Sequence, residues 1–404
     1  MVRRAQDRPA EALSPIVATA AGPLAGIRAL DFAQAAAGPV ALMYLAMLGA
    51  DVIKIEPPRG DISRHALPAQ QGMGTTYLGN NLGKRSVVLD LKAKADLDAA
   101  KELIKTADVA VDNFRGPETM QRLGLGYDTM RQLNPRVIYV QSSGFGNAIG
   151  FDRMACNEWI AQALGGFAGV TGVKNGHFEE SRGTAYFDWF TALINVQAIV
   201  VALAHRQQSG AGQMIQTSQY AATLFAGFTR FAEYLGGGDP PRPFGSERAN
   251  IVPDMVLPTS DGSIALSAPT DPIWKRLCTL LGFAQWLGMS MSARIANRDA
   301  ICEALRQAII TRSTAEWATL FTKYRIPHSD VDSARTISQI LADNAQVNAQ
   351  RMMVSIPSQR GDLLISPAPW HFGRTPALIR RTSPELGENQ DEVLDEIASR
   401  TRKA

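Results

Sequence analysis

The sequence predicts an α/β protein with a large domain on a Rossmann-like parallel sheet and a smaller α+β domain. Short apolar segments alternate with helical segments over residues 26–143. A strand, turn and strand signal with Asp-Gly at its centre, VLPTSDGSIALSA, follows at residues 256–268. The chain has 404 residues, of which 46% are hydrophobic and 20% charged. It is therefore long enough for two domains and can bury a large core.

The predicted parallel sheet uses apolar segments in the first part of the chain. Helical segments separate most of them, which is typical of a parallel sheet covered by helices on both faces. A small-residue turn, AAAGP at residues 35–39, follows the first strand. Such a turn lets a ligand approach backbone amides at a helix N-terminus. The predicted strands are residues 27–32, 51–56, 86–91, 109–114 and 136–144.

The rest of the chain contains predicted helices at residues 158–166, 188–208 and 388–400. Proline and glycine crowd residues 236–243, GGGDPPRP, and predict a linker or loop near the start of a smaller domain at residues 231–331. Residues 1–22 contain arginines, prolines and acids without a sustained apolar segment. We expect them to form a flexible tail, because they do not resemble a signal peptide.

Charge and cysteine usage narrow the functional classes. A formal charge of +3 with scattered basic residues is too mild for nucleic-acid binding. The three cysteines, Cys156, Cys278 and Cys302, have no CxxC spacing, which favours buried free thiols over disulfides or a metal site. The longest apolar stretch, residues 192–204, is too short to cross a bilayer. We therefore expect a cytoplasmic protein that binds neither nucleic acid nor membrane, with no metal.

Motifs along nearly the whole chain resemble the family III coenzyme A transferases, the group of formyl-CoA transferase, carnitine CoA-transferase and the alpha-methylacyl-CoA racemases. The similarity begins with LDF and AGP, continues through LGADVIKIEPPRGD, GKRS and LDLK, and ends with SPELGENQDEVL. The resemblance implies a large CoA-binding domain at residues 23–230, to which residues 332–404 return, so that the large domain is discontinuous. It also implies that two chains interlock in a dimer.

The resemblance places the catalytic nucleophile at Asp188, in YFDWFTAL, at the head of a helix that ends before the turn GAGQ. An aspartate beside aromatic residues is costly to bury unless it is paired or used. Attack of this carboxylate on an acyl-CoA would lead to an aspartyl-CoA thioester. A normal aspartate is ionised at neutral pH, so the reaction needs no general base. The structural alternative for Asp188 is a helix cap.

Glu158 matches a family position that holds an acid near the nucleophile, which implies a supporting role. It could instead only begin a helix, where acids are favoured by the dipole. A racemase of this superfamily has a histidine just before that acid, whereas this chain has Asn157. The sequence therefore disfavours an isomerase of the alpha-methylacyl-CoA racemase type.

Coenzyme A enters as a thioester substrate, and we expect no permanently bound cofactor. Lys84 and Arg85 could contact a phosphate or lie on a solvated hairpin. The positions that the resemblance implies for CoA binding are Gln34, Ala35, Ala37, Leu89, Lys92, Asn113, Phe114 and Arg122.

Arg248 is a candidate partner for a substrate carboxylate, although a solvated loop arginine is an equal alternative. Tyr186, Phe187 and Trp189 could form an aromatic wall for a bulky acid. These residues favour succinyl-CoA as donor and a dicarboxylic or aromatic acceptor such as benzylsuccinate.

Two other functional classes fit parts of the pattern. A dinucleotide oxidoreductase would share the alternating sheet, but AAAGP stands where G-x-G-x-x-G is expected. A noncatalytic subunit of a hetero-oligomeric transferase is the stronger rival, because the residues after Asp188 lack the glycines common in the family. Under that alternative the partner is a related subunit, and otherwise the chain forms a homodimer.

Overall fold

The computed structural model describes residues 21–116, 118–146, 150–151, 154–174, 176, 178–181, 183–331 and 352–401. Most of the predicted tail and the start of the predicted C-terminal return, residues 332–351, lie outside these ranges. The contacts divide the chain into two compact units. The first comprises Met1–Phe167, Arg182–Thr229 and Gln346–Ala404, and the second comprises Ala168–Ser181 and Arg230–Ala345.

The first unit is built on a six-stranded sheet in the order β5-β2-β1-β6-β7-β8. Every neighbouring pair is parallel, as the sequence predicted. The sixth strand, β8, was not predicted. The strands are β1 (Arg28–Asp31), β2 (Asp51–Glu56), β5 (Arg85–Val88), β6 (Val109–Asp112), β7 (Ile138–Ser143) and β8 (Met214–Ser218).

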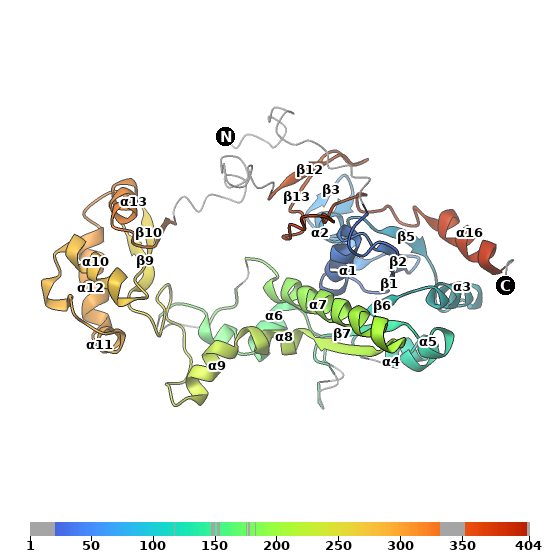
Figure 1. Cartoon of the computed structure of the whole chain (residues 1–404), viewed down its shortest axis with the longest axis horizontal. Helices are drawn as coiled ribbons and strands as arrows, with labels where there is room; N and C mark the ends of the chain where they lie inside the picture. The colour runs from blue at the N-terminus through green and yellow to red at the C-terminus, as the bar shows by residue number, and fades with distance from the viewer. Residues whose placement is uncertain are drawn as a thin grey trace. The chain divides into compact units, whose positions relative to one another are not determined.

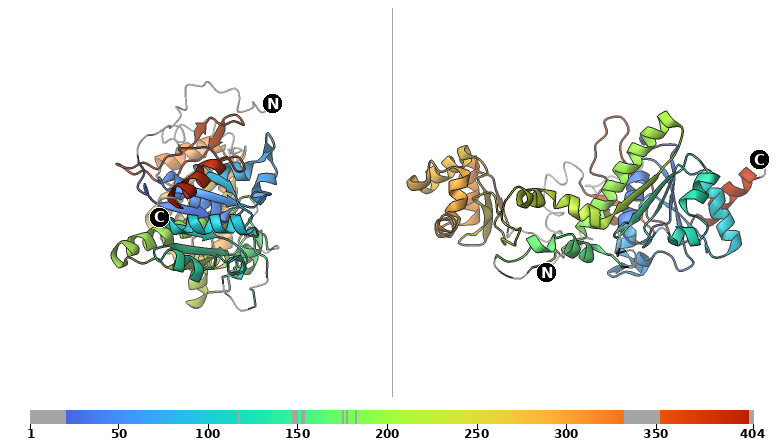
Figure 2. Two further views of the ribbon diagram at one scale, coloured as in Figure 1. Left: turned by 90° about the vertical axis from the view of Figure 1, so that its right-hand side faces the viewer. Right: turned by 90° about the horizontal axis from the view of Figure 1, so that it is seen from below.

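Alternate residues of the strands enter two cores on opposite faces of this sheet. On one face, Val109 and Val111 of β6 pack with α1 (Ala37–Met47) and α7 (Tyr186–Ser209). On the other face, Ala110 packs with α3 (Lys94–Lys105), α5 (Tyr127–Leu133) and α16 (Gln390–Thr401). Helices therefore cover both faces of the sheet (Figures 1 and 2).

The helices α1 and α7 follow from different sequence patterns. All eleven residues of α1 are buried, as expected for a helix that is apolar on every side. The 24-residue α7 ends at Gly210, whose left-handed backbone (φ 73°) suits glycine. Within the described part of the chain, α7 is the one helix that length and composition would allow to cross a membrane, a test that core helices of globular proteins also pass.

The second unit contains a three-stranded antiparallel sheet in the order β11-β10-β9. The predicted hairpin is present as β9 (Asp254–Pro258) and β10 (Ser263–Ser267), with Asp261 and Gly262 in the turn. Trp274, Leu277 and Phe321 lie in its core. The other elements of this unit are β11 (His328–Asp330), α10 (Asp271–Leu281), η5 (Ala284–Trp286), α11 (Met291–Ala296), α12 (Arg298–Ile309), α13 (Thr314–Lys323) and η4 (Ala168–Val170).

Short elements complete the described chain. Antiparallel pairs join β3 (Ala69–Gln70) to β4 (Met73–Gly74) and β12 (Val354–Ile356) to β13 (Leu363–Ile365). The remaining helices are η3 (Ile62–His65), α2 (Thr75–Asn80), α4 (Glu118–Arg122), α6 (Glu158–Leu164), α8 (Gln219–Ala226) and α9 (Phe228–Leu235).

Candidate active site

The strand order reverses at the centre of the large sheet. The chain runs outward from β1 through β2 to β5 and then returns to β6 on the other side of β1. In open parallel sheets, ligands bind at the carboxyl ends of the strands next to such a reversal. Here Gln34 follows β1 and Asn113 follows β6. The amide of Gln34 donates to Asn113 Oδ1 (2.9 Å), and Asn113 Nδ2 donates to the Gln34 carbonyl (2.7 Å).

Buried charges fix the turn around Gln34. The amide of Ala33 donates to Asp31 (3.0 Å), and its carbonyl accepts from Lys54 Nζ (2.8 Å). The amide of Ala35, whose backbone is left-handed (φ 65°), donates to Asp61 Oδ1 (3.1 Å). Because the amides of Gln34 and Ala35 already donate within the protein, a ligand contact at these residues would have to use other atoms. Ala37 is the first residue of α1.

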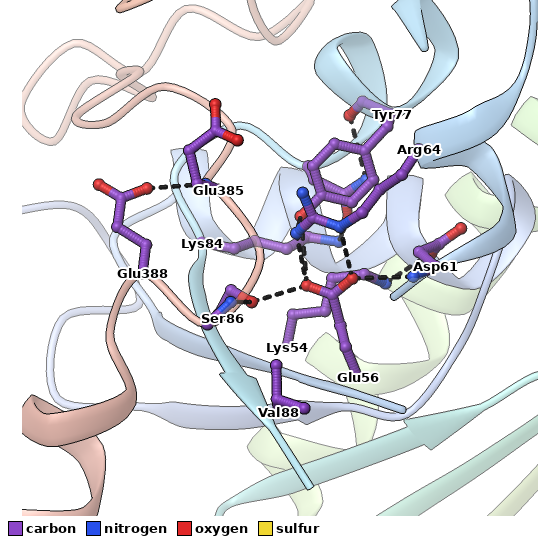
Figure 3. A network of polar contacts seen from close by, with 12 residues as sticks. Lys54, Glu56, Asp61, Arg64, Tyr77, Lys84, Ser86, Val88, Glu385 and Glu388 are labelled. Atoms are coloured by element: carbon purple, nitrogen blue, oxygen red, sulfur yellow. Dashed lines mark hydrogen bonds and ion pairs between the residues drawn. The ribbon is translucent and has the colours of Figure 1, made fainter. Parts of the chain in front are cut away.

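Figure 3 shows Lys54, Asp61 and Lys84 in one network of polar side chains. Lys54 pairs with Asp61 (2.8 Å), and Lys84 pairs with Asp31 (2.7 Å). Lys84 also donates to the Pro39 carbonyl and to Asn81, each at 2.8 Å. Burial lowers the pKa of Lys84 to about 8. Lys84 therefore supports the turn from inside, in place of the predicted phosphate contact or solvated hairpin.

A second part of the same network joins β2 to the C-terminal segment. The guanidinium of Arg64 donates to both oxygens of Glu56 and lies over the ring of Tyr77 (Figure 3). Ser86 donates to Glu56 (2.7 Å) and accepts from the amide of Gly387 (3.0 Å). Arg85, the other predicted phosphate contact, instead pairs with Asp51, Glu392 and Glu396.

The other positions implied for CoA binding also follow strands or end a helix. Leu89 is buried directly after β5, and Lys92 is exposed three residues later. Phe114 follows Asn113 and is half-buried. Arg122, the last residue of α4, is exposed. Of this set, Gln34 and Asn113 are in direct contact.

Asp188 is the third residue of α7, and Glu158 holds the beginning of that helix. Glu158 is buried in α6, and its Oε2 accepts from the amides of Phe187 (2.8 Å) and Asp188 (2.9 Å). Its Oε1 accepts from Gln162 Nε2 (2.7 Å). Helices expose unpaired amides at their N-termini, and carboxylates are stabilised there. The cap of α7 is thus Glu158, and the carboxylate of Asp188 is not used for it.

The carboxylate of Asp188 contacts a side chain that the sequence did not point to. Gln219 Nε2 donates to Asp188 Oδ1 (2.9 Å), and Gln219 Oε1 accepts from the thiol of Cys156 (3.5 Å). Burial raises the pKa of Asp188 to about 7, with a further contribution from the charge of Glu158, against the lowering effect of the Gln219 bond. Asp188 is thus only partly ionised at neutral pH, which differs from the ordinary aspartate that we expected.

Cys156 is half-buried, whereas Cys278 and Cys302 are buried, and all three are free thiols. Burial, together with the charges of Asp188 and Glu158, raises the pKa of Cys156 to about 11. The thiol is therefore protonated at neutral pH and can donate to Gln219. Within the described ranges, no three histidine, cysteine or acidic side chains gather into a metal site.

Asn195 ties α7 to the sheet two turns after Asp188. It is fully buried, donates to Ser142 Oγ of β7 (2.8 Å) and accepts from Thr217 Oγ1 of β8 (2.6 Å). In the sequence, the sign of this role was that Asn195, a polar amide, interrupts the apolar segment at residues 192–204. Because Ser142 and Thr217 lie near the carboxyl ends of their strands, these bonds hold the head of α7 at that edge.

The aromatic residues around Asp188 have different neighbours. Phe187 is buried against Phe167 (ring centroids 5.0 Å apart), whereas Trp189 lies against Tyr44 (6.2 Å). Each residue of a helix is rotated about 100° from the one before, so Phe187 faces away from Trp189, whereas Tyr186, three residues before Trp189, lies on the same side of α7. Of the three predicted wall residues, Tyr186 and Trp189 are exposed on one side of α7, and Phe187 is buried.

Arg248 belongs to the second unit. Its guanidinium lies 3.7 Å from Asp254, and its side chain is 60% exposed. A carboxylate neighbour for Arg248 is thus present in its own unit, and its contact with a substrate carboxylate stays a prediction.

Comparison with known proteins gives concordant matches. The model of CoA-transferase family III matches residues 24–390. The chain is 33% identical to a succinate–glutarate CoA-transferase of Agrobacterium fabrum, covering 95% of this chain and 97% of that protein. It is 31% identical to a succinyl-CoA–L-malate CoA-transferase beta subunit of Chloroflexus aurantiacus, covering 93% and 94%. A crystal structure of a CaiB/BaiF family protein from Brucella suis superposes with a TM-score of 0.80 at 28% identity, covering 93% of this chain and 100% of that one.

Proposed function

Because this chain belongs to CoA-transferase family III, whose members move CoA from donors such as succinyl-CoA to carboxylic acids, we propose that Asp188 is its nucleophile. One observation carries this assignment. Asp188 is a carboxylate at the head of α7 whose amide is held by Glu158 and whose Oδ1 is held by Gln219, while none of the hydrogen bonds among the described residues uses Oδ2. Oδ2 is therefore the oxygen free to attack.

The reaction proceeds by covalent steps in which each leaving group becomes the next nucleophile. Asp188 Oδ2 attacks the thioester carbonyl, the C–S bond breaks, and the CoA thiolate leaves from a mixed anhydride. The thiolate attacks Cγ of Asp188, which releases the donor acid and forms an aspartyl-CoA thioester. The acceptor carboxylate then runs the same steps in reverse. Glu158 supports the reaction by holding the amides of Phe187 and Asp188.

CoA is proposed to bind along the carboxyl edge of the sheet. Gln34 and Asn113 meet where the strand order reverses, a position that favours ligand binding in open parallel sheets. The exposed cations Lys92 and Arg122 suit the phosphates of CoA. Ala35, Ala37, Leu89 and Phe114 complete the proposed binding set.

Succinyl-CoA is the proposed donor and a dicarboxylic acid the proposed acceptor. The names of the two relatives combine succinate or succinyl-CoA with glutarate and with L-malate, which are all short dicarboxylates. For an aromatic dicarboxylate such as benzylsuccinate, Tyr186 and Trp189, exposed on one side of α7, would offer an aromatic surface.

The functional assembly is proposed to be a homodimer of interlocked chains. The match to a beta subunit supports a second candidate, in which the chain works with a related subunit. Asp188 and its contacts favour an active subunit over a noncatalytic one.

Trapping the intermediate tests the nucleophile. Intact-protein mass spectrometry after mixing with succinyl-, acetyl- and formyl-CoA, with and without hydroxylamine, should reveal a CoA adduct or a hydroxamate on Asp188. We expect succinyl-CoA to give the largest adduct and Asp188→Asn to abolish it. Transfer activity that persists in Asp188→Asn would rule out this nucleophile.

A further inference from the structure

The two ends of the Gln219 amide are distinguished by their partners. The form of Asp188 that attacks is the ionised carboxylate, which can only accept hydrogen bonds, so in that form the atom that faces Oδ1 is the Nε2 donor. The protonated thiol of Cys156 donates to the opposite end, Oε1, at 3.5 Å. Both contacts favour the same orientation of the amide, which presents one N–H to Asp188.

The backbone of Gln219 is also held in place. Gln219 is the first residue of α8 and is only 6% exposed. Ser218 caps this helix by accepting from the amide of Ala221 (3.1 Å), and Thr223, which is fully buried, donates its hydroxyl to the Gln219 carbonyl (2.9 Å). The donor to Asp188 thus comes from a buried side chain on an ordered helix.

We propose that Gln219 is a catalytic residue that selects Oδ2 of Asp188 as the attacking atom and stabilises the oxyanion that forms on Oδ1. The inference rests on the proposed role of Asp188 as nucleophile. Once Oδ2 has become the bridging oxygen of the mixed anhydride, Oδ1 is the carbonyl oxygen. Attack of the CoA thiolate on Cγ moves the carbonyl electron pair to Oδ1, where Gln219 donates. When the tetrahedral intermediate collapses, the C–O bond to the donor acid breaks and the pair returns.

The same donor acts in both half-reactions, because the acceptor carboxylate also attacks Cγ. A hydrogen bond to a developing oxyanion strengthens as the charge grows, so it lowers the barrier more than it stabilises the ground state. A glutamine with a purely structural role would not stabilise the transition state more than the ground state. The distinguishing measurements are therefore the rate of adduct formation and its dependence on pH.

The test compares the wild type with Gln219→Met, which keeps the side-chain length without the donor, and Gln219→Glu, which keeps the shape but replaces the donor. Rapid mixing with succinyl-CoA, acid quenching and mass spectrometry would give the rate of aspartyl-CoA formation. Loss of one oxyanion donor typically slows an enzyme by about 10²-fold to 10³-fold. We expect at least a tenfold slower formation of the adduct in both variants, with KM for succinyl-CoA changed less than twofold.

The pH profile gives a second readout. Because the Gln219 bond lowers the pKa of Asp188, its loss in Gln219→Met should move the acidic limb of kcat/KM to higher pH. Gln208→Met, at an exposed position near the end of α7, is the matched control and should leave rate and profile unchanged. Circular dichroism and thermal melting show whether each variant is folded. Should Gln219→Met not fold, the isosteric Gln219→Glu decides the question.

The outcomes separate this inference from the proposed function. If Asp188 forms the adduct and a folded Gln219 variant forms it at the wild-type rate with an unshifted profile, the role of Gln219 is overturned and the nucleophile stands. If transfer persists in Asp188→Asn, the assignment of Asp188 as nucleophile and the proposed role of Gln219 are both excluded. Slower adduct formation together with the shifted limb supports the proposal.

Discussion

At the scale of single residues, Asp188 combines a reactive oxygen, Oδ2, that no hydrogen bond among the described residues uses with burial that disfavours its charged form. Burial and the neighbouring Glu158 raise its pKa from 3.8 to about 7, although Gln219 opposes the shift. The raised pKa makes the carboxylate more basic than an ordinary aspartate, at the cost of partial protonation at neutral pH. We therefore expect the acidic limb of kcat/KM to lie near pH 7.

The same shift predicts how Asp188→Asn changes stability with pH. A carboxyl group whose pKa is higher in the folded state stabilises the fold fully below its unfolded pKa, and this contribution is lost as pH rises to about 7. Asparagine does not titrate. The variant should therefore gain in Tm over the wild type between pH 4 and 7, by an amount on the order of 2 °C, and the gain should be constant above pH 7.

Thermal melting across this range measures the effect, with Asp239→Asn in an exposed loop as control. A difference in Tm that does not depend on pH would contradict the raised pKa.

At the scale of elements, the turn before α1 is held by buried charges from β2 and from the residue that caps η3. Asp61 holds the amide of Ala35 and pairs with Lys54, which in turn holds the carbonyl of Ala33. The side chains of the Lys54–Asp61 ion pair are only 1% and 0% exposed. The network therefore couples the stability of the fold to the shape of the proposed CoA site.

Asp61→Ala should leave the Lys54 charge buried with one partner fewer. Removing one member of a buried ion pair typically costs about 3–5 kcal/mol. We expect a loss of that order in the free energy of unfolding, measured by urea denaturation, together with an increase in KM for succinyl-CoA as the turn loosens. Asp98→Ala removes an exposed pair with Lys94 and should cost less than about 1 kcal/mol. Equal losses in the two variants would show that the network does not hold the turn.

At the scale of the whole molecule, the elements that were predicted correctly from the sequence are those that a local pattern of residues determines. Apolar runs identified β1 and β2, and Asp-Gly identified the hairpin of β9 and β10. The edge strand β8 was missed because it is only partly buried and carries polar residues. Contacts between distant residues were also missed. No residue next to Lys84 in the sequence indicates that it pairs with Asp31. Gln219 contacts Asp188 only because α7 packs back against the sheet.

The surface of the first unit suggests how two chains associate. Val200 and Val201, which are neighbours on α7, are 41% and 62% exposed. Apolar residues that gather on a surface mark contacts with a partner. These side chains therefore suit the proposed dimer.

A charge in this surface should weaken the dimer without disturbing the core, because Val201 packs little within its own chain. Because interlocked chains separate only on unfolding, we expect Val201→Lys to lower the share of dimer regained after unfolding in urea and refolding at micromolar concentration, as measured by light scattering after size-exclusion chromatography. Gln208→Lys adds the same charge to α7 at an exposed polar position and should stay dimeric. A wild type with the mass of one chain would exclude the homodimer and favour the related subunit as partner. A dimer that survives Val201→Lys would place the interface elsewhere on the molecule.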